Sequence, residues 1–341
     1  MKMKKTNGFE NDFSLTDKVL IHKILNGKTI DDFKIIQKEL INQITPIKNP
    51  IYDDTKYGNL ARWKWYKSLK EDWLFFLKIA EIIDDEILYK KLTDLTEIKL
   101  FYSDIGYEVT EYGDSNLRVI RIKFSDITPL YTLTNLSVLD LSGNEIEDIS
   151  RIFELPLLTE LYLNKNPIED FSVVSKLKNL IKLSIDKNQI SNISLFYKLI
   201  NLQELSLIGN KISDISLLSQ LINLTNLYLS ENEISHVCAL SELKKLRELH
   251  LDLNYITDIS PLSSLTNLTD LSLHHNNIFD ISALSELTNL KKLNLRKNNI
   301  SDISAIFNLT NLIELNLIGN EISYSQKQEL KKTLTNCKIT I

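Results

Sequence analysis

The sequence repeats itself every 22 residues over more than half of its length. The same phrase, Leu-x-x-Leu-x-Leu-x-x-Asn-x-Ile with occasional Ile for Leu, occurs in nine successive units. The asparagines that mark these units are evenly spaced, at Asn144, Asn166, Asn188, Asn210, Asn232, Asn254, Asn276, Asn298 and Asn320. A period this regular indicates stacked units, each of which buries its apolar side only against its neighbours. The chain is therefore expected to form an elongated solenoid with one continuous core.

Each position of the unit has a predicted place in this fold. Counted from Leu136 as position 1, the apolar residues at positions 4 and 6 alternate as in a short strand with one side turned inward. The asparagine at position 9 follows the strand, and its amide is expected to bond backbone groups at the bend and to form a ladder through the stack. Asp-Ile-Ser in the second half, as in residues 214–216, suits a tight turn or a single 3₁₀ turn.

The consensus sequence of the units resembles that of the leucine-rich repeat family. Residues 265–273 (Leu-Thr-Asn-Leu-Thr-Asp-Leu-Ser-Leu) and 298–304 (Asn-Asn-Ile-Ser-Asp-Ile-Ser) are similar to the 22-residue class of bacterial internalins and of the regulatory leucine-rich subunit of protein phosphatase 1. The resemblance covers about residues 117–341. It implies an α/β solenoid, an arc with a concave parallel β-sheet and an irregular 3₁₀ convex side, which binds proteins through its concave face without catalysis. No signal peptide or wall-sorting tail is recognised, so the surface role of internalins is not expected.

Three regions are predicted along the chain. Residues 1–94 lack the repeat and are expected to be an α-helical N-terminal region whose three tryptophans belong to a core that caps the first coil, or alternatively to an exposed docking site. Residues 95–324 hold the repeats, with 95–135 as irregular entry coils and 136–324 as the nine regular units. Residues 325–341 are expected to form a C-terminal cap, with a helix over 325–334 and a strand over 338–341.

Composition narrows the classes of partner and chemistry. A net charge of −5 without a concentrated basic stretch argues against nucleic acid, and no apolar run is long enough to span a bilayer. Two cysteines imply no disulfide framework and favour a cytoplasmic location, with export by a route that needs no cleaved signal as the alternative. GxxxxGK[ST], GxSxG, HExxH and CxxC motifs are absent, so neither enzyme activity nor a cofactor is expected. We expect a monomer.

Function is expected where the unit varies, at positions 3, 5, 7 and 8 of the concave face. Three of the five histidines fall there, on two adjacent units. Because binding hot spots favour Tyr and Arg beside an apolar anchor, one mixed patch is predicted to bind the partner: Tyr228, His250, Asp252, Leu253, His274, His275, Arg296 and Lys297. The simpler interpretation is that these are solvated positions which the repeat leaves free. Protonated histidines would favour an anionic partner.

Metal binding is the less favoured interpretation of the same residues. Asp252 and His274 share position 7 on adjacent units, but zinc needs three or four converging ligands. The aspartates at the turns supply one carboxylate per unit, which is too few for calcium. No metal site is therefore predicted.

The sequence alone leaves three functions open. The favoured one is a non-catalytic, protein-binding scaffold or regulator. The first alternative is a secreted or injected effector, or a toxin-associated protein, in which residues 1–94 dock or target the chain. The second is a regulatory subunit of an enzyme such as a phosphatase.

Overall fold

The computed structural model describes residues 97–99, 125, 127, 130–131 and 133–341. The predictions made for residues 1–94, including the helices and the tryptophan cluster, lie outside these residues.

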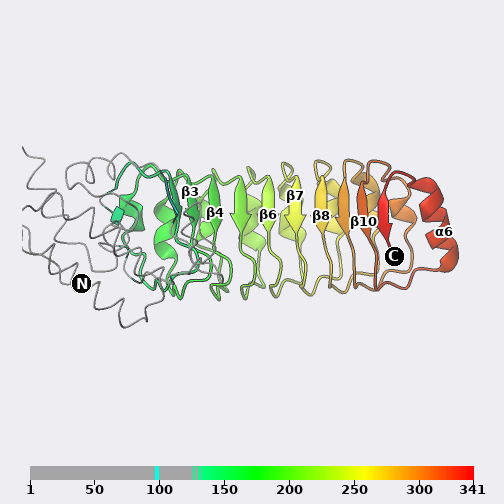
Figure 1. Ribbon diagram of the computed structural model, residues 1–341, viewed down its shortest axis with the longest axis horizontal. Coiled ribbons are helices and arrows are strands. Elements are labelled where there is room, and N and C mark those ends of the chain that lie inside the picture. Colours follow the sequence, from blue (N-terminus) through cyan, green and yellow to red (C-terminus); the bar gives the residue numbers. More distant parts are fainter. Residues whose placement is uncertain (1–96, 100–124, 126, 128–129, 132) are drawn as a thin grey trace, which may run out of the picture.

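The strands form one parallel sheet in which every strand pairs with its neighbours in the sequence (Figure 1). Each regular unit contributes a strand of three residues at positions 3 to 5, and the register joins equivalent positions, as in Leu227 beside Leu249. The leucine at position 4 is buried, while its two neighbours face outward. The parallel sheet predicted from the repeat is confirmed, with the strands β1 (Glu97–Lys99), β2 (Val138–Asp140), β3 (Glu160–Tyr162), β4 (Lys182–Ser184), β5 (Glu204–Ser206), β6 (Asn226–Tyr228), β7 (Glu248–His250), β8 (Asp270–Ser272), β9 (Lys292–Asn294), β10 (Glu314–Asn316) and β11 (Lys338–Thr340).

The opposite side of each unit is a short 3₁₀ helix. The aspartate that precedes it caps the turn, since Asp214 Oδ1 accepts a hydrogen bond of 2.8 Å from the Ser216 amide. A leucine from the helix, such as Leu218, closes the core. The expected solenoid arc with an irregular convex side is thus observed, and the 3₁₀ helices are η2 (Ile152–Glu154), η3 (Ser172–Lys176), η4 (Phe196–Lys198), η5 (Ser216–Gln220), η6 (Cys238–Glu242), η7 (Ser260–Ser264), η8 (Ser282–Glu286) and η9 (Ser304–Ile306).

The asparagines at position 9 form the predicted ladder. Asn232 is typical: its amide nitrogen donates to the Leu229 carbonyl of its own unit at 3.0 Å and to the Leu207 carbonyl of the preceding unit at 2.9 Å. Its oxygen accepts from the Ile212 amide of the preceding unit at 3.0 Å. Backbone polar groups inside a solenoid have no water to bond, so one amide per unit satisfies donors and acceptors of two units together.

The C-terminal end of the array carries helix α6 (Tyr324–Thr333), which packs Leu330 into the core. Ser323 caps the helix by accepting a hydrogen bond from the Gln326 amide. The chain then returns to the sheet as β11, the last strand in Figure 1. The helix and strand predicted for this segment are confirmed within one or two residues at each end.

At the N-terminal end of the sheet, the first two described strands are adjacent. Strand β1 pairs directly with β2, placing Ile98 opposite Leu139. Paired strands lie about 4.8 Å apart, so no third strand fits between them. The entry coil expected over residues 117–127 lies almost wholly outside the described residues, which include only Ser125 and Ile127 of it.

Candidate protein-binding face

Two rows of side chains run along the outward face of the sheet, because residues on either side of each buried leucine point the same way. The row at position 3 is largely charged: Glu160, Lys182, Glu204, Asn226, Glu248, Asp270, Lys292, Glu314 and Lys338. Lys182 lies between two acids, with Nζ 3.6 Å from Glu160 and 3.9 Å from Glu204. The row at position 5 is mainly polar and aromatic: Tyr162, Ser184, Ser206, Tyr228, His250, Ser272, Asn294, Asn316 and Thr340.

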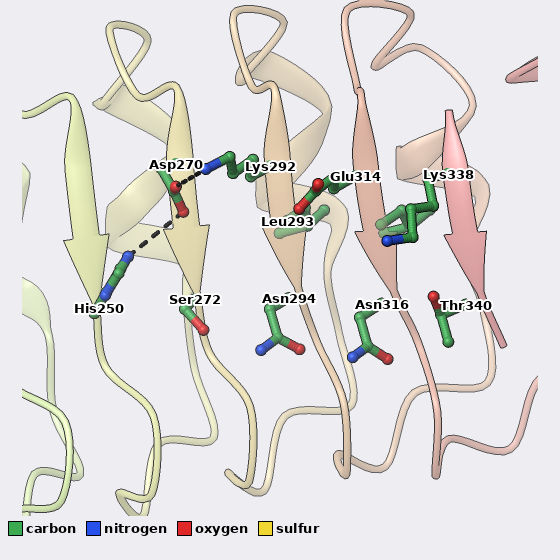
Figure 2. Close-up of a pocket in the computed structure, with 11 residues that line it drawn as sticks. His250, Asp270, Ser272, Lys292, Leu293, Asn294, Glu314, Asn316, Lys338 and Thr340 are labelled. Atoms are coloured by element: carbon green, nitrogen blue, oxygen red, sulfur yellow. Dashed lines mark ion pairs between the residues drawn. The ribbon is translucent and has the colours of Figure 1, made fainter. Parts of the chain in front are cut away.

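The two rows border a shallow groove over β7 to β11, which we call the C-terminal groove. It has a volume of about 340 Å³ and is lined by both rows, with Leu293 and Leu315 among its lining residues. Figure 2 shows the charged row above the polar row. Asp270 lies between two basic side chains, since its oxygens lie 3.5 Å from His250 Nε2 and 3.6 Å from Lys292 Nζ.

Tyr228 and His250 lie beside this groove as an aromatic pair. Their ring centroids are 5.1 Å apart with an interplanar angle of 76°, an edge-on contact. The Tyr228 hydroxyl donates to the Glu248 carboxylate, which also accepts a hydrogen bond of 2.6 Å from Asn226 Nδ2. Burial and the bond to Glu248 raise the pKa of Tyr228 to about 12. The hydroxyl therefore stays protonated at neutral pH, and the ring is fixed on the sheet.

Position 7, just beyond the strand, carries a second ladder in part of the array. Asp252 Oδ1 accepts from the His274 amide of the next unit at 2.8 Å and from the Ser272 hydroxyl, and its other oxygen accepts from the Ser230 hydroxyl at 3.2 Å. Asp186 makes the equivalent bonds three units earlier. The carboxylate of Asp252 thus joins neighbouring units, although the sequence suggested it as a partner-binding residue.

Position 8 is a left-handed turn. Glycine occupies it at 143, 209 and 319, and six other residue positions adopt the same positive φ there, including Leu253 (55°), His275 (60°) and Lys297 (53°). These residues stand beyond the ends of the strands, at a rim of the sheet. His275 Nε2 lies 3.3 Å from Lys297 Nζ, and Arg296 is exposed beside them.

The eight residues predicted as one patch therefore fall on two surfaces. Tyr228 and His250 lie on the sheet, and only His250 lines the C-terminal groove. The remaining six lie at or beyond the strand ends. The prediction missed the groove residues of the position 3 row, Asp270, Lys292, Glu314 and Lys338. Position 3 is counted among the variable positions of the concave face, but nothing in the spacing singles out these four residues within it.

The described residues contain no group of three or more His, Cys, Asp or Glu side chains arranged to hold a metal ion. Asp252 and His274, weighed above as zinc ligands, lie in this part of the chain. No helix in the described ranges is long and apolar enough to cross a membrane.

Comparison with known proteins fits this architecture. A family model described as "Leucine Rich repeats (2 copies)" matches residues 244–286 and 288–331, and a "Leucine Rich repeat" model matches residues 132–150. The structure of internalin C2 from Listeria monocytogenes is 35% identical with a TM-score of 0.53, over 55% of this chain and 82% of that chain. This chain belongs to the internalin-like leucine-rich repeat proteins.

Two further structures extend the comparison of this internalin-like protein. Internalin inlF of Listeria monocytogenes is 30% identical with a TM-score of 0.57, over 74% of this chain and 81% of that chain. The functional domain of InlJ from Listeria monocytogenes shares the fold alone, at 21% identity and a TM-score of 0.55, over 74% of this chain and 54% of that chain. A comparison with curated protein sequences found no match.

Proposed function

We propose that this internalin-like protein is a non-catalytic scaffold or regulator that binds a protein partner on its concave face. The observation that carries the proposal is the pair of outward side-chain rows held on a continuous sheet. Eleven strands at about 4.8 Å each give a face roughly 50 Å long. A face of this length, with shallow relief, suits a macromolecule better than a small metabolite, which binds in enclosed pockets.

Within this face, we propose Tyr228, His250 and the C-terminal groove as the centre of binding. Tyr228 is an aromatic side chain already fixed by Glu248, so little rotamer freedom is lost when a partner covers it. His250, Asp270 and Lys292 beside it form a connected set of polar and charged groups, in which Asp270 and Lys292 are oppositely charged. Such charges fix the register of a partner, because a misplaced partner leaves some of them unpaired.

Affinity purification with the full chain, followed by titration of the captured protein, tests this proposal. We expect the double variant Tyr228→Ala/His250→Ala to weaken binding by about tenfold or more, as hot-spot truncations do. Tyr197→Ala, which removes an exposed tyrosine from η4 on the convex side, is the matched control and should leave affinity unchanged. Retention of every partner at unchanged affinity by the double variant would refute the proposal.

We further propose that the protein is a cytoplasmic monomer. The two cysteines, Cys238 and Cys337, are free thiols, which is typical of proteins from reducing compartments. Fractionation of the native cell tests the location, and recovery only outside the cytoplasm would instead favour the exported-effector function. Sedimentation of the purified chain tests the oligomeric state.

A further inference from the structure

Three large apolar side chains are exposed on two adjacent units. Leu253 is 40% exposed, Tyr255 60% and Phe279 64%. The units are in direct contact here, since the Asn277 amide donates to the Ile256 carbonyl at 2.9 Å. Ile256 and Ile278 are buried, so the residues on either side of them face solvent. This alternation turns Tyr255 and Phe279 to the same outer surface of neighbouring units.

The repeat itself does not require these apolar residues. Tyr255 stands at position 10 and Phe279 at position 12, where the other eight units have polar residues or proline: Glu145, Pro167, Gln189, Lys211, Glu233, Asn277, Asn299 and Glu321 at position 10, and Glu147, Glu169, Ser191, Ser213, Ser235, Thr257, Ser301 and Ser323 at position 12. The core is complete without them, because position 11 supplies the buried side chain in every unit. Because these two aromatic side chains add nothing to the core, they are candidates for an interaction site.

Two neighbouring cations follow on the adjacent unit. Arg296 and Lys297 lie on the next unit, with Lys297 Nζ 3.3 Å from His275 Nε2, and neither cation forms an ion pair within the described part of the chain. Among the acids of these units, Glu233 is exposed and forms no ion pair with a described residue, whereas three others have partners. Glu231 pairs with Lys187 at 3.9 Å across Gly209, Asp252 holds its neighbouring units together, and Asp280 accepts the Ser282 amide at 2.8 Å.

We propose that this rim cluster, formed by Leu253, Tyr255, Phe279, His275, Arg296 and Lys297, docks a protein segment that carries an apolar side chain next to Asp or Glu. The aromatic and leucine side chains would cover the apolar residue, and Arg296 would hold a carboxylate through its planar pair of donors. Nucleic acid fits less well, because phosphate recognition needs a broader basic surface and the chain carries a net charge of −5. The proposal goes beyond the concave-face function, since it assigns a second surface and its ligand chemistry.

A displayed peptide library tests it without knowledge of the natural partner. Random peptides on phage are selected against the full chain, and the enriched peptides are synthesised and titrated. Two rim variants are compared, Tyr255→Ser/Phe279→Ser and Arg296→Glu/Lys297→Glu. The matched controls are Ile200→Ser/Ile222→Ser, an equally exposed apolar pair on adjacent units, and Lys244→Glu/Lys245→Glu, an exposed pair of neighbouring cations. Thermal unfolding of each variant checks that it is folded.

We expect the enriched peptides to combine Asp or Glu with a large apolar residue. Both rim variants should weaken them by about tenfold or more, and both controls should leave them unchanged. Tyr228→Ala/His250→Ala should also leave the affinity for these peptides unchanged. The test is therefore independent of the concave-face proposal. Failure to enrich peptides, enrichment of Lys and Arg, or equal binding by the rim variants would overturn the proposal. Loss of binding in Tyr228→Ala/His250→Ala, or Arg296-dependent binding of a duplex oligonucleotide or an anionic vesicle without peptide binding, would do so as well.

Discussion

The buried asparagine ladder and the position 7 ladder at the edge of the sheet use the same device in two different settings. In both, a side-chain oxygen accepts a backbone amide of a neighbouring unit, as Asn232 does for Ile212 and Asp252 does for His274. The first is seen at every asparagine from Asn166 to Asn320, whereas in the regular units the second has its carboxylate form at Asp186 and Asp252 only. Asn164 makes the corresponding bond to the Asp186 amide.

The difference teaches how to separate structure from function in a repeat protein. A residue that recurs in every unit is plainly part of the scaffold, but a residue that varies is not thereby free for binding. Asp252 varies within its column and is still engaged by three donors from adjacent units. Substitutions of recurring residues and of varying residues should therefore differ in how much they lower the free energy of unfolding.

The largest effect is expected from the apolar interior. Leu249→Ala removes a side chain that is fully buried in β7 and leaves a cavity between two units. We expect the free energy of unfolding to fall by about 2–5 kcal/mol, measured by denaturant titration. A loss below about 0.5 kcal/mol would show that the surrounding leucines collapse into the space.

The asparagine ladder comes next. Asn232→Ala leaves the Leu207 and Leu229 carbonyls and the Ile212 amide without the partners they have in the native fold. Each buried unsatisfied group costs about 1–3 kcal/mol, partly relieved by local movement, so we expect a loss of about 2–4 kcal/mol. Asn320→Ala, at the partly exposed last rung, should cost less because water can replace the amide. Equal losses at the two sites would contradict the role assigned to burial.

The ladder at the edge of the sheet should matter less than the buried one. Asp252→Ala removes the acceptor shared by Ser230, Ser272 and the His274 amide, but the site is half-buried and water can enter. We expect a loss of about 1–2 kcal/mol in chemical unfolding. His274→Ala is the neighbouring control, since it keeps that amide, and its effect should stay within about 0.5 kcal/mol. A control that destabilises as much as Asp252→Ala would make the imidazole, not the carboxylate, the structural group.

The smallest expected effect is on stability at acid pH, and it arises from the aspartates of the convex turns. Bonds from the Ser216 and Ser260 amides lower the pKa of Asp214 and Asp258 in the folded chain. Their stabilisation is therefore present above the unfolded pKa of about 4 and is lost as pH falls through the lowered folded pKa. The chain already contains the substitution that removes this titration, since Asn192 accepts the Ser194 amide at 2.8 Å.

Asp214→Asn/Asp258→Asn should accordingly lose less stability than the wild type between pH 7 and pH 3, compared by unfolding midpoints. Asp186 has the opposite sign, because burial raises its pKa and its contribution is lost as pH rises through that value. Asp186→Asn should therefore not reduce the loss on acidification. A drop in the Asp214→Asn/Asp258→Asn variant as steep as in the wild type would exclude the turn aspartates as its source.

The sequence could predict most of the scaffold, because each part of it repeats with the same local cause. The period placed the strands, the amide of Asn232 could be assigned to the bend, and Asp214 could be assigned to the turn. The entry coils are less regular in sequence, since Ser103 and Ser125 stand where the regular units have asparagine and the spacing before Leu136 is shorter.

The candidate site was harder to predict, because exposure alone does not say what a side chain contacts. The Tyr228–Glu248 bond joins positions 5 and 3 of adjacent units, and no spacing rule within one unit shows it. The left-handed turn at position 8 could be recognised in the sequence, since glycine stands there at 143, 209 and 319. Glycine favours that conformation without steric cost, so its recurrence in one column could have placed Leu253, His275 and Lys297 on the rim.

The left-handed turns also create a trade-off between folding stability and ligand binding. A residue other than glycine pays about 1–2 kcal/mol to adopt this backbone conformation. Leu253, His275 and Lys297 carry that cost on three consecutive units of the rim cluster. Laboratory selection for a more heat-resistant chain should therefore drift toward glycine at these positions, while selection for a retained ligand should hold the larger side chains in place.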